Sequence, residues 1–184
     1  RESDQERNVV RQSPLRDGGR RENSAEHSGH LAVYELGLVE HAAEAVDVQR
    51  VLTMLLLHDI VEIDVGDMPI HGGTSAAHQA QLEAVAAQRL FGMLPQPQSE
   101  DMLALWHEFE GARSADARFA KALDRFQPLL ANIFAGGGTW TENGVSMEQV
   151  LERYGPVIRE GAPSLWALCE QWVIEHFQSH PAPR

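Results

Sequence analysis

The chain has 184 residues, a hydrophobic content of 43% and a formal net charge of −12, so we expect one domain with a substantial buried core. The negative charge argues against binding to nucleic-acid polymers and to anionic membranes. The sequence contains no apolar run of the roughly 18 residues that a transmembrane helix needs. The charged start of the chain lacks the apolar core of a secretory signal, and the single cysteine, Cys169, cannot form an internal disulfide. We therefore expect a cytoplasmic protein.

Apolar residues recur at helical spacing from the start of the chain, and no segment alternates like a strand. A short first helix is expected to end before Pro14, and a turn follows at residues 17–19. The next helix begins at a cap formed by Asn23 or Ser24 and extends to about Val46. Its buried face is predicted to hold Leu31, Leu36, Leu38 and Val39.

A third helix is predicted to begin after a cap at Asp47 and to end near Ile63. Gly66, Pro69 and the glycines at 72–73 indicate a loop after it.

The rest of the chain is predicted to form helices at 75–90, 99–110, 114–134, 147–153 and 163–178. The expected buried positions of the first two are Leu82, Val85, Ala86, Leu90, Leu103, Leu105, Trp106 and Phe109. Pro128 is expected to kink the third of them, because proline removes a backbone hydrogen bond. A flexible loop is predicted at residues 136–138.

Two polar residues, His58 and Asp59, stand side by side in an otherwise apolar helical segment. Burying an imidazole and a carboxylate there is costly unless a partner compensates for the lost solvent. A metal ion binds both groups, and it is the partner that we expect. Further polar residues that such a site needs lie elsewhere in the chain, namely His27, Glu62, Asp67 and Asp124.

Three segments sharpen this interpretation, namely Arg20-Arg-Glu-Asn-Ser-Ala-Glu-His-Ser28, Leu57-His-Asp-Ile-Val-Glu-Ile-Asp-Val-Gly-Asp67 and Lys121-Ala-Leu-Asp-Arg-Phe-Gln127. In this order they resemble the HD-domain superfamily of metal-dependent phosphohydrolases, close to the bacterial 5'-deoxynucleotidase branch. The resemblance covers about residues 9–135. It implies an all-α HD-domain helical bundle, which we expect to be a single domain over residues 1–184 with C-terminal helices at 146–180.

The resemblance also implies a role for each polar residue. The implied ligands of one divalent metal ion are His27, His58, Asp59 and Asp124. Two nitrogen and two carboxylate donors suit Mn²⁺, Co²⁺, Fe²⁺ or Zn²⁺ and leave positions open for water and a phosphate oxygen. Glu62 and Asp67 become the catalytic pair that handles the protons of the water and the leaving group. Arg11 best matches a substrate-contacting arginine. His78 and His107 follow no recognised metal-binding pattern, so one metal is predicted.

Alternatives stay open for several of these residues. Glu62 can instead lie solvated at a helix end, and Asp124 can pair with Arg125 or Lys121. The basic N-terminal residues Arg11, Arg16, Arg20 and Arg21 can form a solvated cluster that pairs with neighbouring glutamates. Each of these arginines can therefore be either a substrate-binding residue or a member of this solvated cluster.

The expected reaction is hydrolysis of (deoxy)nucleoside 5'-monophosphates to nucleoside and phosphate. The alternatives are another phosphorylated small molecule, such as a nucleoside di- or triphosphate or a non-nucleotide, and a metal-stabilised binding protein without turnover. Relatives usually carry aromatic residues where this chain has Gly29 and Gln12, so we expect a permissive pocket. The resembled family often forms homodimers, for which Trp166, Trp172 and Phe177 offer an interface unless they belong to the core.

Overall fold

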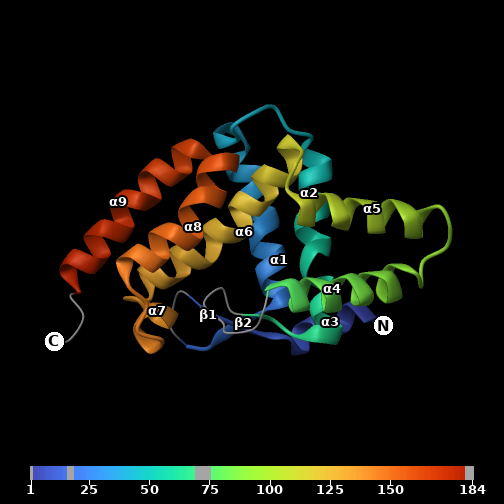
Figure 1. Cartoon of the computed structure of the whole chain (residues 1–184), viewed down its shortest axis with the longest axis horizontal. Coiled ribbons are helices and arrows are strands. Elements are labelled where there is room, and N and C mark those ends of the chain that lie inside the picture. The colour runs from blue at the N-terminus through green and yellow to red at the C-terminus, as the bar shows by residue number, and fades with distance from the viewer. Residues whose placement is uncertain (1, 16–18, 69–75, 181–184) are drawn as a thin grey trace.

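Figure 1 shows a molecule built almost entirely of helices, in a computed structural model that describes residues 2–15, 19–68 and 76–180. The α-helices are α1 (Ser24–Leu38), α2 (Val48–Leu57), α3 (Glu62–Val65), α4 (Ala76–Phe91), α5 (Gln98–Gly111), α6 (Ala115–Phe134), α7 (Gly138–Glu142), α8 (Met147–Gly161) and α9 (Pro163–Ser179). Shorter 3₁₀ segments are η1 (Glu2–Asn8), η2 (Val39–His41) and η3 (His58–Val61). The predicted all-α fold is confirmed. Within the described residues, no helix combines the length and apolar character that crossing a membrane requires.

The first part of the chain departs from the prediction, because it forms a small antiparallel hairpin of β1 (Val10–Pro14) and β2 (Arg21–Asn23). The expectation that no strand exists is therefore wrong, and the first helix is a 3₁₀ segment that already ends at Asn8. The inward-facing residues of β1 are Arg11 and Ser13, which are 9% and 8% exposed. Because these positions face a polar pocket, the strand shows no apolar alternation. Residues 17–18 of the predicted turn lie outside the described residues.

Helix α1 begins at the predicted cap, where Asn23 accepts a hydrogen bond from the backbone of Glu26 (3.0 Å) and Glu26 accepts one from the backbone of Asn23 (3.1 Å). It ends at Leu38, well before the predicted end at Val46. The backbone N–H of Ala43 donates instead to the carbonyl of Gly161 (2.9 Å), so this stretch is attached to the end of α8.

The predicted buried face of α1 is only partly correct. Leu31 is fully buried and Leu38 and Val39 pack against the core, but Leu36 is 65% exposed.

The third predicted helix is divided into α2, η3 and α3. Asp47 caps α2 as predicted, accepting hydrogen bonds from the backbones of Gln49 (3.0 Å) and Arg50 (3.2 Å). The helix then tightens into η3 at His58 and ends at Val65. Gly66 follows with a φ of 77°, which glycine adopts without steric cost and which stops the helix. Pro69 and the glycines at 72–73 lie outside the described residues.

Helices α4 and α5 form a second, smaller apolar cluster with η3. Ala86 and Leu90 of α4 are buried as predicted, but Leu82 and Val85 are 41% and 62% exposed, so their assignment to the core is wrong. In α5, Trp106 and Phe109 are buried as predicted, and Leu103 and Leu105 are partly buried against the core.

The long helix α6 lies in the middle of the molecule and packs against α8 and α9 as well as α1 and α2 (Figure 1). Ser114 caps it by accepting a hydrogen bond from the backbone of Ala117 (3.1 Å). The helix continues through Pro128 to Phe134. Its buried residues Phe119, Leu123 and Leu129 belong to the main core.

The end of the chain is more helical than predicted. Helix α8 continues to Gly161 through Pro156, beyond the predicted end at Arg153. The loop predicted at residues 136–138 is a turn that leads into the short helix α7, which begins at Gly138. Trp166 is 3% exposed and belongs to the core, while Trp172 and Phe177 are partly buried against it. A homodimer remains a prediction.

Candidate metal centre

Two histidines and two aspartates converge at the bottom of a pocket beside α6. His27 comes from the first turn of α1, His58 and Asp59 from η3, and Asp124 from the middle of α6. His27 Nε2 lies 3.1 Å from Asp124 Oδ1 and 3.8 Å from Asp59 Oδ2. His58 Nε2 lies 3.0 Å from Asp59 Oδ1 and 3.5 Å from Asp124 Oδ1. The structure therefore brings together all four residues that the sequence predicts as metal ligands.

The hydrogen bonds of the two imidazoles leave the same nitrogen of each ring facing the carboxylates. The Nδ1–H of His58 donates to the backbone carbonyl of Leu55 (2.9 Å), and that of His27 donates to Gln127 Oε1 (3.2 Å). The Nε2 atom of each ring then points into a group of carboxylate oxygens, and it carries a lone pair whenever the ring is neutral. Among the described residues, His58 Nε2 has no hydrogen-bond partner. Such an arrangement fits a cation placed between these four side chains.

The charges of the centre lead to the same conclusion. Burial lowers the pKa of His58, but the negative charges of Asp59 and Asp124 outweigh burial and raise this pKa to about 10. Burial raises the pKa values of Asp59 and Asp124, yet Arg11 and the histidines hold the pKa of Asp59 below its usual range, and the histidines and Arg125 do the same for Asp124. The centre therefore stabilises positive charge strongly. His27, His58 and Asp59 each offer one ligand atom, and these atoms lie within 4.8 Å of one another.

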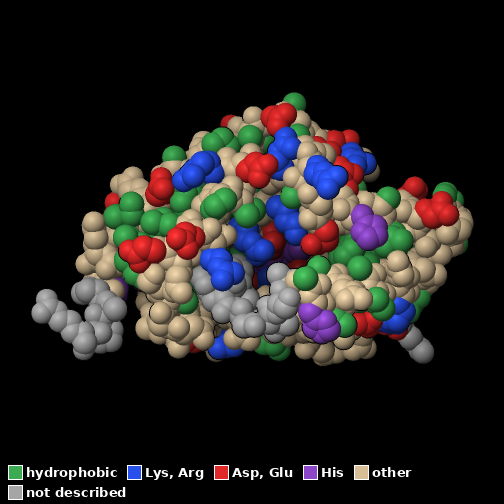
Figure 2. All heavy atoms as spheres, in the orientation of Figure 1, with side chains coloured by type: hydrophobic (Ala, Val, Ile, Leu, Met, Phe, Trp, Pro, Cys, Tyr) green, Lys and Arg blue, Asp and Glu red, His purple; other side chains and the backbone are tan. Residues whose placement is uncertain are grey.

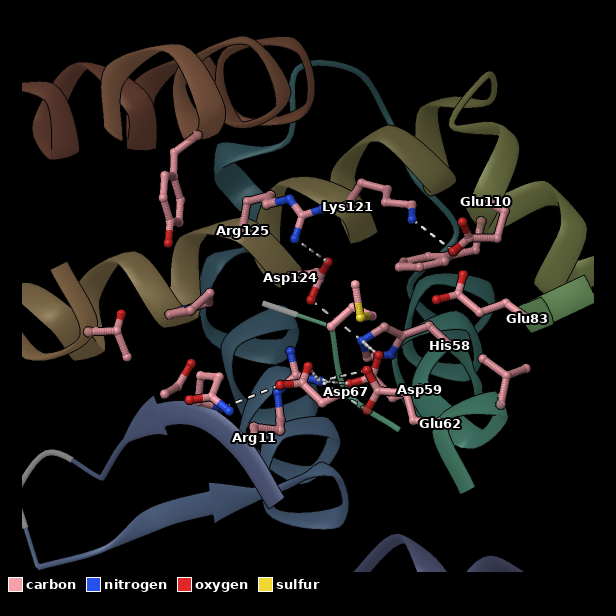
Figure 3. Close-up of a pocket in the computed structure, with 18 of the residues that line it drawn as sticks. Arg11, His58, Asp59, Glu62, Asp67, Glu83, Glu110, Lys121, Asp124 and Arg125 are labelled. Atoms are coloured by element: carbon pink, nitrogen blue, oxygen red, sulfur yellow. Dashed lines mark hydrogen bonds and ion pairs between the residues drawn. The ribbon is translucent and has the colours of Figure 1, made fainter. Parts of the chain in front are cut away.

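Arg11 enters the pocket from β1 and lies among carboxylates (Figure 3). It donates a hydrogen bond to Asp59 Oδ2, and its Nη1 atom lies 3.3 Å from Glu62 Oε2 and 3.6 Å from Asp67 Oδ1. Its Nε atom lies 3.7 Å from Glu22 Oε1. The guanidinium thus balances four negative groups. That Arg11 also contacts a substrate phosphate remains a prediction.

Glu62 and Asp67, the predicted catalytic pair, lie next to this guanidinium. Glu62 is only 8% exposed and accepts a hydrogen bond from Ser24 Oγ (2.7 Å), which excludes the alternative of a solvated helix-end residue. Burial and the charge of Asp59 raise the pKa of Glu62 to about 9, against the opposing effect of Arg11. Burial also raises the pKa of Asp67, whose Oδ2 accepts a hydrogen bond from the backbone N–H of Gln12 (3.2 Å). Glu62 can therefore hold a proton near neutral pH, and burial shifts the pKa of Asp67 in the same direction.

A supporting layer behind His27 escaped the sequence prediction. Glu22 and Gln127 are 2% and 3% exposed, and Gln127 Nε2 donates to Glu22 Oε2 (2.8 Å). Gln127 Oε1 in turn accepts the hydrogen bond from His27. Both residues stand inside the motif segments quoted above, but nothing in their spacing distinguishes them from surface residues.

The outer part of the pocket holds further charges. Figure 2 shows Lys and Arg side chains gathered around a hollow in this face of the molecule. Lys121 Nζ donates to Glu110 Oε1 (2.8 Å) and lies over the ring of Phe109. Arg125 Nη1 lies 3.7 Å from Asp124 Oδ2. The other N-terminal arginines form surface pairs instead, since Arg20 binds Glu26 and Arg21 binds Glu142; Arg16 lies outside the described residues.

The sequence predicted that Gln12 and Gly29 remove aromatic bulk from the pocket, but only one of them lines it. Gln12 lines the pocket as expected. Gly29 is exposed on α1 and does not line the pocket, and a Cβ atom placed there meets no atom within 4 Å. The expectation that Gly29 widens the pocket is therefore wrong.

Most of this chain resembles known proteins. The family model of the HD domain matches residues 3–166. The crystal structure of a predicted metal-dependent phosphohydrolase from Magnetospirillum magnetotacticum MS-1 is 46% identical and superimposes with a TM-score of 0.91, covering 96% of this chain and 88% of that one.

Relatives with named activities are more distant. The 5'-deoxynucleotidase HDDC2 of Bos taurus is 28% identical over 109 residues, which are 59% of this chain and 52% of that protein. The 5'-deoxynucleotidase of Yersinia pestis (strain Pestoides F) is 26% identical over 153 residues, 78% of each chain. This chain thus spans about half the length of the bovine relative.

Proposed function

The chain belongs to the HD-domain family, and we propose that it is a metal-dependent phosphomonoesterase that releases phosphate from nucleoside 5'-monophosphates. One observation carries the proposal. Two buried imidazoles direct their Nε2 atoms toward two carboxylates, and this group lies at the bottom of a pocket lined by Glu62 and Asp67. The resemblance to 5'-deoxynucleotidases supports a nucleotide as the substrate.

One divalent ion fits this donor set, and His27, His58, Asp59 and Asp124 would hold it. When bound, such an ion polarises a phosphoryl oxygen and lowers the pKa of water. The side chains around it have complementary tasks. The hydrogen bonds from His27 to Gln127 and from His58 to the backbone of Leu55 fix the orientation of both rings.

Glu62 is the group that we assign to the attacking water. Its carboxyl group accepts hydrogen bonds from Ser24 and Arg11, which hold it in one orientation toward the centre. Nearby cationic charge favours the ionised form of a carboxyl group. Burial and the charge of Asp59 raise the pKa of Glu62 to about 9, and a divalent ion held by the four ligands would lower it toward the neutral range. A general base with a pKa near the working pH is the effective kind.

Asp67 is the group that we assign to the leaving group. Burial raises its pKa, which favours the protonated form that a departing nucleoside 5'-oxygen requires. The backbone N–H of Gln12 fixes one of its oxygens, and Gln12 itself lines the pocket. The leaving part of the substrate would then lie beside β1.

A second candidate substrate class is a non-nucleotide phosphomonoester. The aromatic side chains among the described pocket-lining residues are Phe109 and Tyr154, which are 1% and 2% exposed. Neither offers an open ring face on which a nucleobase can stack. This favours either weak discrimination between bases or a substrate without a base.

The test is phosphate release from a panel of ribo- and deoxynucleoside 5'-monophosphates, adenosine triphosphate and p-nitrophenyl phosphate, each with Mn²⁺, Co²⁺, Fe²⁺ and Zn²⁺. We expect turnover of several nucleoside monophosphates with at least one metal. Turnover of p-nitrophenyl phosphate alone would favour the non-nucleotide class. Absence of turnover on every compound, in a protein that contains metal, would contradict the proposal.

A further inference from the structure

We propose that Arg125 binds the non-bridging oxygens of the substrate phosphate at the open side of the metal centre. The inference rests on the proposed phosphomonoesterase function and adds a residue that recognises the phosphate. Neither the motif spacing nor the predicted arginine cluster at the N-terminus points to this position.

The first step is the position of Arg125 beside a ligand of the centre. Asp124 turns its Oδ1 atom toward the imidazoles, at 3.1 Å from His27 Nε2. Its other oxygen, Oδ2, lies 3.7 Å from Arg125 Nη1. A single carboxylate group therefore separates the guanidinium from the candidate metal ligands, and Figure 3 shows Arg125 reaching from α6 toward Asp124.

The second step compares the cationic side chains that line the pocket, namely Arg11, Lys121 and Arg125. Arg11 is surrounded by four carboxylates, and Lys121 is paired with Glu110 at 2.8 Å. Arg125 donates no hydrogen bond to any of the described residues, although a guanidinium has five N–H donors. Its side chain is 31% exposed, so these donors face the pocket and remain available to a ligand.

The third step is the charge of the pocket. Carboxylates line it on both sides of the centre, and the outer ones are Glu83 and Glu110. A phosphomonoester dianion that enters meets repulsion from these groups. Arginine compensates such repulsion well, because its planar fork donates two parallel hydrogen bonds to two phosphate oxygens.

The fourth step concerns the class of ester. A phosphomonoester has three non-bridging oxygens, whereas a diester has two. If one oxygen is directed to the centre, a monoester still presents two oxygens to the fork of Arg125, and a diester presents one. The pocket should therefore favour monoesters.

The test is calorimetric titration of inorganic phosphate into Mn²⁺-loaded protein, compared between wild type, Arg125→Ala and Arg125→Lys. Charge-assisted hydrogen bonds of this kind correspond to roughly a ten- to hundredfold change in affinity. We expect this loss in Arg125→Ala and a smaller loss in Arg125→Lys, which keeps the charge but not the fork. Arg118→Ala is the matched control. Arg118 lies two turns earlier on α6 and binds Glu44 on the surface, so phosphate affinity should not change.

Elemental analysis of the same samples separates phosphate binding from an effect on the metal. Equal phosphate affinity in wild type and Arg125→Ala would overturn the inference, as would a failure of the loaded wild type to bind phosphate. A loss of Mn²⁺ from Arg125→Ala, with normal phosphate affinity once Mn²⁺ is saturating, would also overturn it, because Arg125 would then act only by orienting Asp124. If wild type and Arg125→Ala hydrolyse the same monophosphates with the same KM, the inference fails while the proposed function stands.

Discussion

Arg11 and Arg125 reach the same pocket from β1 and α6, but their surroundings differ (Figure 3). Arg11 is 9% exposed and is held by four carboxylates, so its charge is used within the protein. Arg125 has one ion pair, at 3.7 Å, and open donors. The comparison teaches that the surroundings of an arginine decide its role. We infer that the closed side of the pocket, around Arg11, organises the proposed catalytic groups, while the open side, around Arg125, binds the phosphate of the substrate.

The largest expected effect is on turnover, and it comes from Glu62 on the closed side of the pocket. Glu62→Gln keeps the size of the side chain but removes the proton acceptor, so we expect turnover to fall by about a hundred- to ten-thousandfold. Metal content and phosphate affinity should stay close to wild type, because Glu62 is not among the proposed ligands.

Asp64→Asn is the matched control for this experiment, since Asp64 lies on the same short helix but binds Arg89 at the surface. A Glu62→Gln variant with wild-type kcat would remove Glu62 from the mechanism and shift the proton transfer to Asp67.

The next effect sharpens the comparison between the two arginines directly. Arg11→Ala leaves a group of buried carboxylates without their counter-charge, so we expect the free energy of unfolding to fall by about 3 kcal/mol. Arg125→Ala breaks only a long, partly exposed ion pair and should cost less than about 1 kcal/mol. Urea denaturation of both metal-free variants provides the measurement. Equal losses would show that the two sides of the pocket do not differ as described.

Removal of the metal should lower the stability of the protein, because the proposed ligands come from separate parts of the fold. A ligand that binds only the folded state stabilises it by about 2.7 kcal/mol at one hundred times its Kd. We expect the Tm to drop when a chelator removes the ion and to recover when Mn²⁺ is added back. A Tm that does not depend on metal would contradict a centre assembled from three separate parts of the fold.

The smallest effect concerns selectivity on the side of β1. Gln12 lines the pocket, whereas Gly29 lies on the exposed side of α1. Adding apolar bulk with Gln12→Trp should change the preference between deoxyribo- and ribonucleotides by roughly 1–3 kcal/mol in kcat/KM. Gly29→Trp serves as the control and should leave this ratio unchanged. A change in the Gly29 variant alone would mean that the pocket extends farther than the described residues indicate.

Local chemistry made parts of the fold predictable. Asn23 and Asp47 have side chains that cap helices, and both caps occur at positions that the sequence predicted. The adjacent polar pair His58 and Asp59 was informative because an apolar segment gives two such residues no other partner. Asp124 then converges on them as expected.

Other features depend on contacts between distant segments and could not be predicted. Leu36 and Val85 fit a helical apolar pattern yet are exposed, because no element covers that face of their helices among the described residues. The hairpin was missed because Arg11 and Ser13 point into a polar pocket and break the expected alternation. The support that Glu22 and Gln127 give to His27 joins residues more than one hundred positions apart.

The central claim is that His27, His58, Asp59 and Asp124 hold one divalent ion at the bottom of the pocket. The most direct measurement is elemental analysis of the purified protein beside His58→Ala, Asp124→Ala and the surface control Arg118→Ala, with circular dichroism to confirm that each variant is folded. We predict one ion per chain in the wild type and the control, and loss of the ion in both ligand variants. Full metal content in His58→Ala and Asp124→Ala would contradict the account.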